Sequence, residues 1–339
     1  MKNKTNTVEQ QKNSAARQIM GFLMVTFLCI VAAELASRFF WSRYGVPISD
    51  PGRILYAYYP EMIKVDQDRP SRGNGFYNVL LLGGSVLHKN WGTVEKELGA
   101  QLASSGYKNV RIYNLAMPGH TSRDSWLKYS TLGQSRFDLV VYYHGINDSR
   151  ANNAPPEIFR KDYSHYIWYE MVNTMARHHG SALFALPYTL QYLAVSTRQT
   201  LTKDRYIPFS NIREEWVQYG GAIRSAESFR QNLSDILNVA SSRGDRVMTM
   251  TFATYVPNDY SPESYEWPLE ICGRREFVLS AIHSHNEIVK KLAAKNKRGW
   301  ITDQAALMPG DASFFEDPYH LTAAGSRQFV KNMLKVLLQ

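Results

Sequence analysis

The stretch VLLLGGSVL (Val79–Leu87) decides the fold of this chain. A short apolar run is followed directly by two glycines and a serine. An uninterrupted apolar run bounded by turn residues is typical of a parallel strand that is covered on both faces. Open parallel sheets bind ligands at the carboxyl ends of their strands, so we expect Ser85 at such an edge. An ordinary Gly-Gly-Ser turn capping a helix is the alternative, and a P-loop is excluded because no Gly-Lys-Ser/Thr follows.

Outward from this stretch, short apolar runs alternate with amphipathic segments of helix length. The expected strands are 77–82, 110–115, 139–143, 247–252 and 300–301. The expected helices are 93–105, 122–132, 223–241, 276–295 and 322–338. This alternation predicts βαβ units, and so an α/β fold with a central parallel sheet and helices on both faces.

Two regions depart from that alternation. Residues 39–76 are rich in Pro, Gly, Tyr and charged residues, which predicts a linker and lead-in running over the surface before a domain at 77–339. Residues 152–221 are dense in Tyr and Trp and contain the apolar stretch SALFALPYTLQYLAV (181–195). We expect a helical insertion over the site there, with extra packing without a functional role as the alternative.

The N-terminus has the pattern of a membrane segment. Residues 1–18 are polar and mostly basic, and the run Ile19–Ala33 has no charge. A hydrocarbon core of about 30 Å needs about 20 helical residues, so we expect a cytoplasmic leader at 1–18 and a transmembrane signal anchor at 19–38. The basic leader keeps the N-terminus in the cytoplasm and places the rest of the chain outside, with Phe39–Trp41 as an aromatic belt. A signal-peptidase site at Val31–Ala33, giving a cleaved and exported protein, and a buried core helix are the alternatives.

The overall charge argues against nucleic acid. The 339-residue chain has a formal net charge of +9, but its Lys and Arg residues are scattered and do not alternate with aromatic residues. An anionic lipid surface or an acidic glycan is a simpler partner for such a surface. The two cysteines, Cys29 and Cys272, lie far apart in the sequence, so no disulfide framework is expected.

Two further strand ends carry polar residues. YNLAMPGHTSRDS (113–125) places Gly119 just past the second strand, and LVVYYHGINDSR (139–150) places Asn147 and Asp148 at the end of the third. Three strand ends thus bring a hydroxyl, a glycine and a side-chain amide to one edge. The backbone N–H groups of Ser85 and Gly119 and the Asn147 amide could together hold an oxyanion. A turn with Asx hydrogen bonding is the alternative for Gly-Ile-Asn-Asp.

A fourth motif, FFEDPYHLTAAG (314–325), lies near the C-terminus. Asp317 and His320 are three residues apart, and Pro318 between them disfavours a regular helix. The carboxylate can therefore reach the imidazole Nδ1 while Nε2 faces a nucleophile. A neutral imidazole can accept a hydroxyl proton and return it to a leaving group. Taken alone, the pair would more commonly be part of a surface loop.

Together and in this order, the four motifs resemble the conserved blocks of the SGNH/GDSL hydrolase superfamily, over residues 77–149 and 311–338. The resemblance implies that Ser85 is the nucleophile, His320 the base and Asp317 its orienting acid, with Ser85, Gly119 and Asn147 as oxyanion donors. It also implies a flavodoxin-like three-layer α/β/α fold, no cofactor, and hydrolysis of esters of lipids, small acyl groups or acetylated sugars. The family often has Gly-Asp-Ser where this chain has Gly84 in the middle, which favours carbohydrate esterases over lipases.

The remaining histidines do not form a convincing metal site. The adjacent pair at 178–179 diverges, and the pair at 283 and 285 points to different faces of an expected helix, so no metal is expected. His88 and His144 lie near the expected edge and either contact substrate or simply pack.

Three functions remain open. The first is a serine esterase that removes acyl, most simply acetyl, groups from an envelope glycan or small ester, and the second an acyltransferase with the same triad. The third is a catalytically silent glycan-binding component. The acyl group and the oligomeric state are not predicted.

Overall fold

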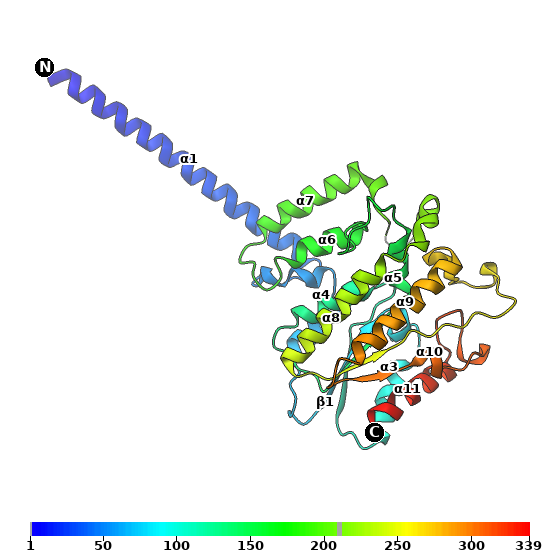
Figure 1. Ribbon diagram of the computed structural model, residues 1–339. Coiled ribbons are helices and arrows are strands. Elements are labelled where there is room, and N and C mark those ends of the chain that lie inside the picture. Colours follow the sequence, from blue (N-terminus) through cyan, green and yellow to red (C-terminus); the bar gives the residue numbers. More distant parts are fainter. Residues whose placement is uncertain (1, 209–211) are drawn as a thin grey trace. The chain divides into compact units, whose positions relative to one another are not determined.

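The computed structural model describes residues 2–208 and 212–339, with side chains from Ala16 onward (Figure 1). The chain divides into two compact units. Unit 1 comprises Met1–Tyr58 and Met175–Ala194, and unit 2 comprises Tyr59–Thr174 and Val195–Gln339. Met1 and the side chains of residues 2–15, which carry most of the basic leader, lie outside the described part of the chain.

Unit 2 contains a five-stranded parallel sheet in the order β2-β1-β3-β4-β5. Its strands are β1 Tyr77–Gly83, β2 Val110–Asn114, β3 Leu139–Tyr143, β4 Val247–Met250 and β5 Trp300–Thr302. Leu81 pairs with Asn114 and Gly83 with Tyr143, so the first three strands end close together at one edge. Both the parallel sheet and this flavodoxin-like order confirm the predicted α/β fold.

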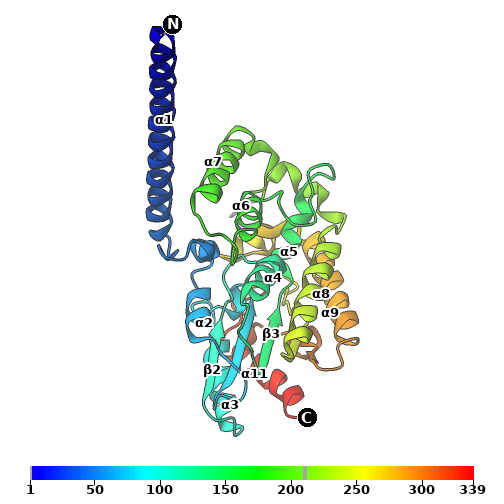
Figure 2. The same cartoon turned by 90° about the vertical axis from the view of Figure 1, so that its left-hand side faces the viewer.

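Helices cover both faces of the sheet (Figure 1). The long ones are α3 Val94–Ser104, α4 Ser122–Thr131, α8 Ser225–Arg243, α9 Arg275–Ala293 and α11 Ala323–Leu337. On one face α8 packs between α4 and α9, and on the other α3 packs against α11. Figure 2 shows α8 beside α9 from a second direction. All five predicted helices are therefore confirmed, with ends displaced by only one or two residues.

Short helices connect these elements in unit 2. They are α2 Met62–Asp68, η2 Ser85–Leu87, α5 Ile146–Ser149, η3 Arg150–Asn153, η6 Pro262–Ser264, η7 Leu269–Cys272, α10 Gln304–Leu307 and η8 Ala312–Phe314. The described residues of the predicted insertion include the helices α6 Ile167–Ala176, α7 Leu186–Leu201, η4 Lys203–Arg205 and η5 Glu214–Gly221, which are joined by non-helical segments.

Unit 1 contains α1 Lys2–Ser42 and η1 Pro51–Ala57. Its segment Ala16–Ser42 is long and apolar enough to cross a membrane, and a signal sequence would have the same properties. Trp41, expected in an aromatic belt, is instead buried, and its Nε1 donates a hydrogen bond of 2.9 Å to Thr189 Oγ1. Phe39 is exposed, as a lipid-facing residue would be.

The segment expected to be a surface linker, 39–76, is folded instead. It contains the end of α1, η1 and α2, and the side chains of Ile54, Leu55 and Tyr59 are fully buried. The frequent Pro and Gly residues interrupt any regular apolar periodicity, so the sequence pattern gave no indication of this burial. The boundary of the predicted domain at 77 remains a prediction.

Candidate active site

Ser85 begins the short helix η2 directly after β1, at the carboxyl edge of the sheet. The two glycines before it allow close packing. A Cβ on Gly83 would lie 2.8 Å from Leu87 Cδ1, and a Cβ on Gly84 would lie 2.7 Å from Asn147 Nδ2. Gly84 therefore lets the Asn147 amide lie against the turn that carries Ser85, which gives a structural reason for glycine at this position.

Ser85, His320 and Asp317 form a continuous hydrogen-bonded chain. Ser85 Oγ lies 2.7 Å from His320 Nε2, and His320 Nδ1 lies 2.5 Å from Asp317 Oδ2. Asp317 Oδ1 also accepts hydrogen bonds from the backbone N–H groups of Tyr319 and His320, at 2.9 and 2.8 Å. The tight turn that begins at Asp317 thus fixes the carboxylate by its own backbone, and Thr322 then caps α11 through a bond from Gly325 N.

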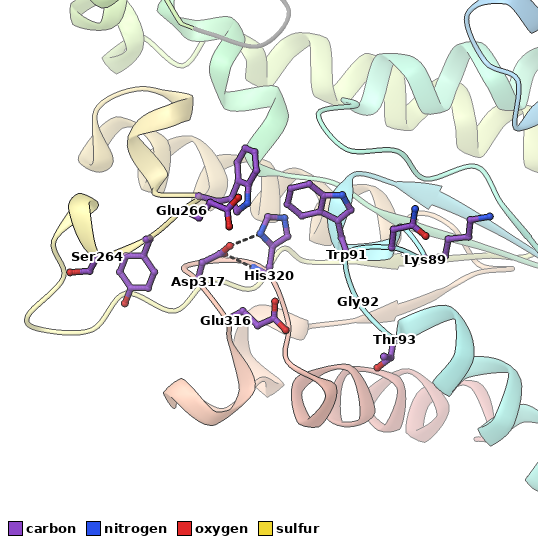
Figure 3. A pocket seen from close by; sticks show the side chains of 12 residues that line it. Lys89, Trp91, Gly92, Thr93, Ser264, Glu266, Glu316, Asp317 and His320 are labelled. Atoms are coloured by element: carbon purple, nitrogen blue, oxygen red, sulfur yellow. Dashed lines mark hydrogen bonds and ion pairs between the residues drawn. The ribbon is translucent and has the colours of Figure 1, made fainter.

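The chain of three side chains is shielded but not sealed from solvent. Ser85 is 8% exposed, His320 3% and Asp317 7%. The Trp91 ring lies 4.8 Å from the His320 ring between centroids, and Figure 3 shows the two side by side. Shielding of this kind strengthens the hydrogen bonds between the three groups, because less water competes for them.

Gly119 and Asn147 line the same small cavity as Ser85 and His320, about 190 Å³ in volume. Gly119 has φ of +75°, which L side chains rarely adopt, so the turn after β2 requires glycine there. Asn147 lies on α5, immediately after β3, and its Nδ2 donates a 2.8 Å hydrogen bond to His120 O. A side-chain amide has two N–H hydrogens, so the second can still serve a bound ligand.

Buried polar side chains behind this edge hold its loops in place. Asp148 Oδ2 accepts a 3.0 Å bond from Ser122 N, Asp148 Oδ1 accepts a 2.5 Å bond from Ser122 Oγ, and Tyr163 Oη also donates to Asp148. Lys128 Nζ lies 3.0 Å from His120 Nδ1. Burial lowers the pKa of His120 to about 4, so its ring is neutral near pH 7 and accepts from the lysine. The loop that carries Gly119 is thereby anchored to α4.

A second, larger cavity of about 680 Å³ adjoins the first. Trp91, Trp267 and His320 border both cavities. The two tryptophan rings meet edge to face with centroids 5.0 Å apart, so they form a wall between the cavities. The larger cavity is otherwise polar and is lined by Lys89, Asn90, Gly92, Thr93, Ser264, Tyr265, Glu266, Glu316 and Asp317 (Figure 3).

Several residues at these cavities were not anticipated from the sequence: Trp91, Trp267, Arg150, Glu266 and Glu316. Arg150 is mostly buried and lines the smaller cavity, only three residues beyond Asn147. Its closeness to the Gly-Ile-Asn-Asp motif was the one signal that could have drawn attention to it. A single tryptophan in a sequence gives no indication of whether it packs or lines a cavity.

The other histidines occupy separate places. His144 is buried and hydrogen-bonded to Ser125, and His285 is buried and hydrogen-bonded to Ser225, so His144 packs and does not contact substrate. His88 lines a third cavity, which Lys89 also lines. His178 is hydrogen-bonded to Gln191, and the His179 ring accepts a hydrogen bond from Leu55 N. His283 is exposed on α9. Within the described residues there is no group of three His, Cys, Asp or Glu side chains that could hold a metal ion.

No family model matches the sequence, and no curated protein matches it. Among solved structures, a GDSL-like lipase from Bacteroides thetaiotaomicron is similar at 14% identity, with 83% of this chain and 97% of that chain covered and a TM-score of 0.45. A lipase/acylhydrolase from Enterococcus faecalis is similar at 16% identity, with coverages of 76% and 93% and a TM-score of 0.41. An acetyl xylan esterase from Geobacillus stearothermophilus is similar at 14% identity, with coverages of 79% and 95% and a TM-score of 0.43.

These three similar structures are described as a lipase/acylhydrolase, a GDSL-like lipase and an acetyl xylan esterase. By motif order and by type of fold, the chain resembles the SGNH/GDSL hydrolases.

Proposed function

We propose that this protein is a serine ester hydrolase in which Ser85 is the nucleophile, His320 the general base and Asp317 the residue that orients it. The observation that carries the proposal is the chain of hydrogen bonds of 2.7 and 2.5 Å from Ser85 Oγ through the imidazole to the carboxylate, next to a cavity lined by Gly119 and Asn147. This combination of nucleophile, base, orienting acid and donors is what acyl transfer requires.

In the first half of the reaction, Ser85 Oγ attacks the ester carbonyl carbon and its proton passes to His320 Nε2. The Asp317 carboxylate accepts a hydrogen bond from Nδ1–H and stabilises the imidazolium that forms. The carbonyl oxygen becomes an oxyanion, which the Ser85 and Gly119 N–H groups and the free Asn147 N–H stabilise. His320 then returns the proton to the departing alcohol, which leaves an acyl group on Ser85.

In the second half, water takes the place of the departed alcohol. His320 removes a proton from that water as the oxygen attacks the acyl carbon. The same three donors hold the second oxyanion, and collapse of this intermediate releases the carboxylic acid and returns the proton to Ser85. No redox partner or metal ion takes part in this sequence of steps.

The two cavities support a sugar ester with a short acyl group. The smaller cavity, about 190 Å³, has room for a small acyl group such as acetyl beside Ser85. The larger one offers the rings of Trp91 and Trp267 together with carboxylates of Glu266 and Glu316. Aromatic faces pack against the C–H faces of a sugar ring, and carboxylates accept hydrogen bonds from its hydroxyls. We therefore assign the acyl group to the smaller cavity and the alcohol, a glycan hydroxyl, to the larger.

The anchor and the location are part of the same proposal. The helix Ala16–Ser42 would hold the protein in a membrane, with the basic leader in the cytoplasm and the catalytic domain outside. In that position the site faces the glycans of the cell envelope.

The test is to label the purified full-length chain with a fluorophosphonate probe and to locate the modified residue by mass spectrometry. We expect modification of Ser85 and loss of labelling in Ser85→Ala, with Ser125→Ala as the matched control because its hydroxyl is hydrogen-bonded to a histidine in the same way. Absence of labelling at Ser85 would favour the silent binding protein. Acetate release from a model ester without added glycan supports the proposed hydrolysis. If turnover requires an acceptor glycan, acyl transfer would be the activity instead of hydrolysis.

A further inference from the structure

Unit 1 contains a second apolar surface besides α1. Residues Ser181–Ala194, which cover the start of α7 and the turn before it, contain no charged side chain. Within this stretch Leu183 is 76% exposed, Phe184 60%, Leu190 59% and Leu193 54%. We call these four residues the apolar patch. Large side chains of this kind are normally buried, and a cluster of exposed ones marks a surface that contacts something apolar.

The exposed apolar residues are unevenly distributed over the described part of the chain. Outside α1, unit 1 exposes six large hydrophobic side chains, the four of the apolar patch together with Tyr44 and Ile48. The much larger unit 2 exposes five, which are scattered: Leu201, Trp267, Ile301, Leu307 and Leu338. Chance exposure would not concentrate such residues in the smaller unit.

The start of α7 is largely apolar on both of its sides, with Gln191 as the exposed polar side chain there. Ala185 and Tyr188 are fully buried within the protein, and Leu190 and Leu193 face outward three residues apart. A surface helix on a water-soluble protein would carry charged or polar side chains on the outward side. The outward side of this segment therefore has the character of a surface that meets hydrocarbon.

Hydrogen bonds attach this segment to α1 at a defined level. The Glu34 carboxylate accepts from Ala185 N at 2.9 Å and from Leu186 N at 2.8 Å, which caps the start of α7. One turn further along α1, Arg38 Nη2 donates to Leu183 O at 2.8 Å. These bonds fix Leu183–Leu186 beside residues 34–38 of α1.

That level is the outer end of the membrane span. About 20 helical residues cross a hydrocarbon core, so a span that begins at Ile19 ends near Arg38. The segment bonded to residues 34–38 therefore lies at the boundary between acyl chains and headgroups. Leu183 and Phe184 come directly before the capped residues, so they lie at this level, where α1 also exposes Leu35 and Phe39.

We propose that the apolar patch is a second membrane contact, which lies in the headgroup and acyl-chain boundary of the bilayer that α1 crosses. The occupant of this surface is lipid, because the patch begins beside residues 34–38 of the span and has no charge that would select a protein partner. An uncharged apolar face of a helix at that depth is stabilised by burial in the interface. This inference rests on the proposed anchoring by α1 and is independent of the proposed esterase chemistry.

The experiment uses the full-length chain in nanodiscs that hold one chain each, with a single environment-sensitive fluorophore attached to a cysteine. Labels are placed at Phe184→Cys, Leu190→Cys and Leu193→Cys in a Cys29→Ser background, with exposed Ser241→Cys on α8 as the matched control. A separate sample of the wild-type chain, labelled at Cys29 within the span, serves as the depth reference. Cys272 is buried with its thiol pKa raised to about 11, so it reacts slowly. Circular dichroism confirms that each variant folds.

We expect the emission of labels at 184, 190 and 193 to be blue-shifted relative to the label at 241. Lipids with a nitroxide near the headgroup should quench these three labels several-fold more strongly than the label at 241. Quenching at Cys29 by deep nitroxides, with positions 184, 190 and 193 as unquenched as 241, would overturn the inference and leave the anchor intact. An unquenched Cys29 would instead refute the anchoring itself. A blue shift without lipid quenching, which grows when two chains share a disc, would assign the patch to a second copy and also overturn the inference.

Discussion

Among the described residues, three serine–histidine pairs have hydrogen bonds of similar geometry. Ser85 Oγ lies 2.7 Å from His320 Nε2, Ser125 Oγ 2.7 Å from His144 Nε2, and Ser225 Oγ 2.9 Å from His285 Nε2. Only the first pair stands beside a cavity and has a carboxylate on the other ring nitrogen. A hydrogen bond between hydroxyl and imidazole is thus insufficient to identify a nucleophile.

The surroundings of the other two pairs explain why they are structural. The Nδ1 of His285 lies 3.2 Å from Gly145 O, a carbonyl rather than a carboxylate. Burial lowers the pKa of His144 to about 3 and of His285 to about 4, so neither ring readily becomes the imidazolium that proton transfer requires. What distinguishes a reactive pair is access for a substrate together with a group that stabilises positive charge.

The largest expected effect contrasts two of these pairs directly. Ser85→Ala should lower kcat for a model acetyl ester by about 10,000-fold or more, because the nucleophile is removed. Ser125→Ala should leave kcat within a few-fold of wild type, because the lost hydroxyl is hydrogen-bonded to the buried His144 and does not line the cavity beside Ser85. Steady-state ester hydrolysis measures both. Equal losses in the two variants would contradict the assignment of Ser85.

The next effect tests the donors that only the Ser85 site has. Asn147→Ala should lower kcat by about 100- to 1,000-fold with little change in KM, since an oxyanion forms only during the reaction. A rise in KM with unchanged kcat would show instead that Asn147 only binds the substrate before the reaction. Its proposed role as an oxyanion donor would then be wrong.

A smaller effect is expected from the glycine beside Ser85. In Gly84→Ala the new Cβ would meet Asn147 Nδ2 at 2.7 Å, so the amide must move away. We expect kcat to fall by about tenfold, and by no more than the 100- to 1,000-fold of a fully lost donor. The free energy of unfolding should change little, because the end of a side chain can shift. Adding Gly84→Ala to Asn147→Ala should lower kcat almost no further, because both changes act through the Asn147 amide. Fully additive losses of kcat would disprove this shared cause.

The smallest expected effect concerns the free energy of unfolding and the buried side chain of Asp148. Burial raises the pKa of Asp148 to about 7, above its value of about 3.9 in an unfolded chain. The protonated carboxyl favours folding, and that contribution is lost as pH rises toward and through 7. Asp148→Asn cannot lose a proton, so its free energy of unfolding relative to wild type should increase by on the order of 1 kcal/mol per pH unit between about pH 5 and about pH 7.

Urea unfolding of both proteins at several pH values measures this difference. A constant offset between Asp148→Asn and wild type across that range would mean that the carboxyl is ionised throughout, held charged by its bonds from Ser122 and Tyr163.

The fold could be predicted from the sequence because its signals are local. Each apolar run and each amphipathic segment of the sheet domain is visible within ten to twenty residues, and the parallel arrangement then places Ser85, Gly119 and Asn147 at one edge. The structure brings His320 and Asp317 to the same point, while their catalytic roles remain predictions.

The features that the sequence did not reveal depend on contacts between distant segments. Trp91 and Trp267 are 176 positions apart, and only the folded chain shows that their rings meet beside His320. The same holds for Trp41, whose partner Thr189 lies far along the chain, and for Ile54 and Leu55 among prolines and glycines. Periodicity describes one segment at a time and cannot identify such pairs.

In the proposed mechanism, the wall made by Trp91 and Trp267 would affect the lifetime of the acyl-enzyme. His320 borders the larger cavity as well as the smaller one, so as the proposed base it would serve whichever hydroxyl next occupies the space vacated by the leaving group. A sugar that dissociates quickly admits water, and the acyl group is lost as free acid. A sugar chain that slides without dissociating keeps water out and presents another hydroxyl to the same base. The balance between ester hydrolysis and acyl transfer would then depend on how fast the sugar leaves the larger cavity, and not on the proposed triad itself.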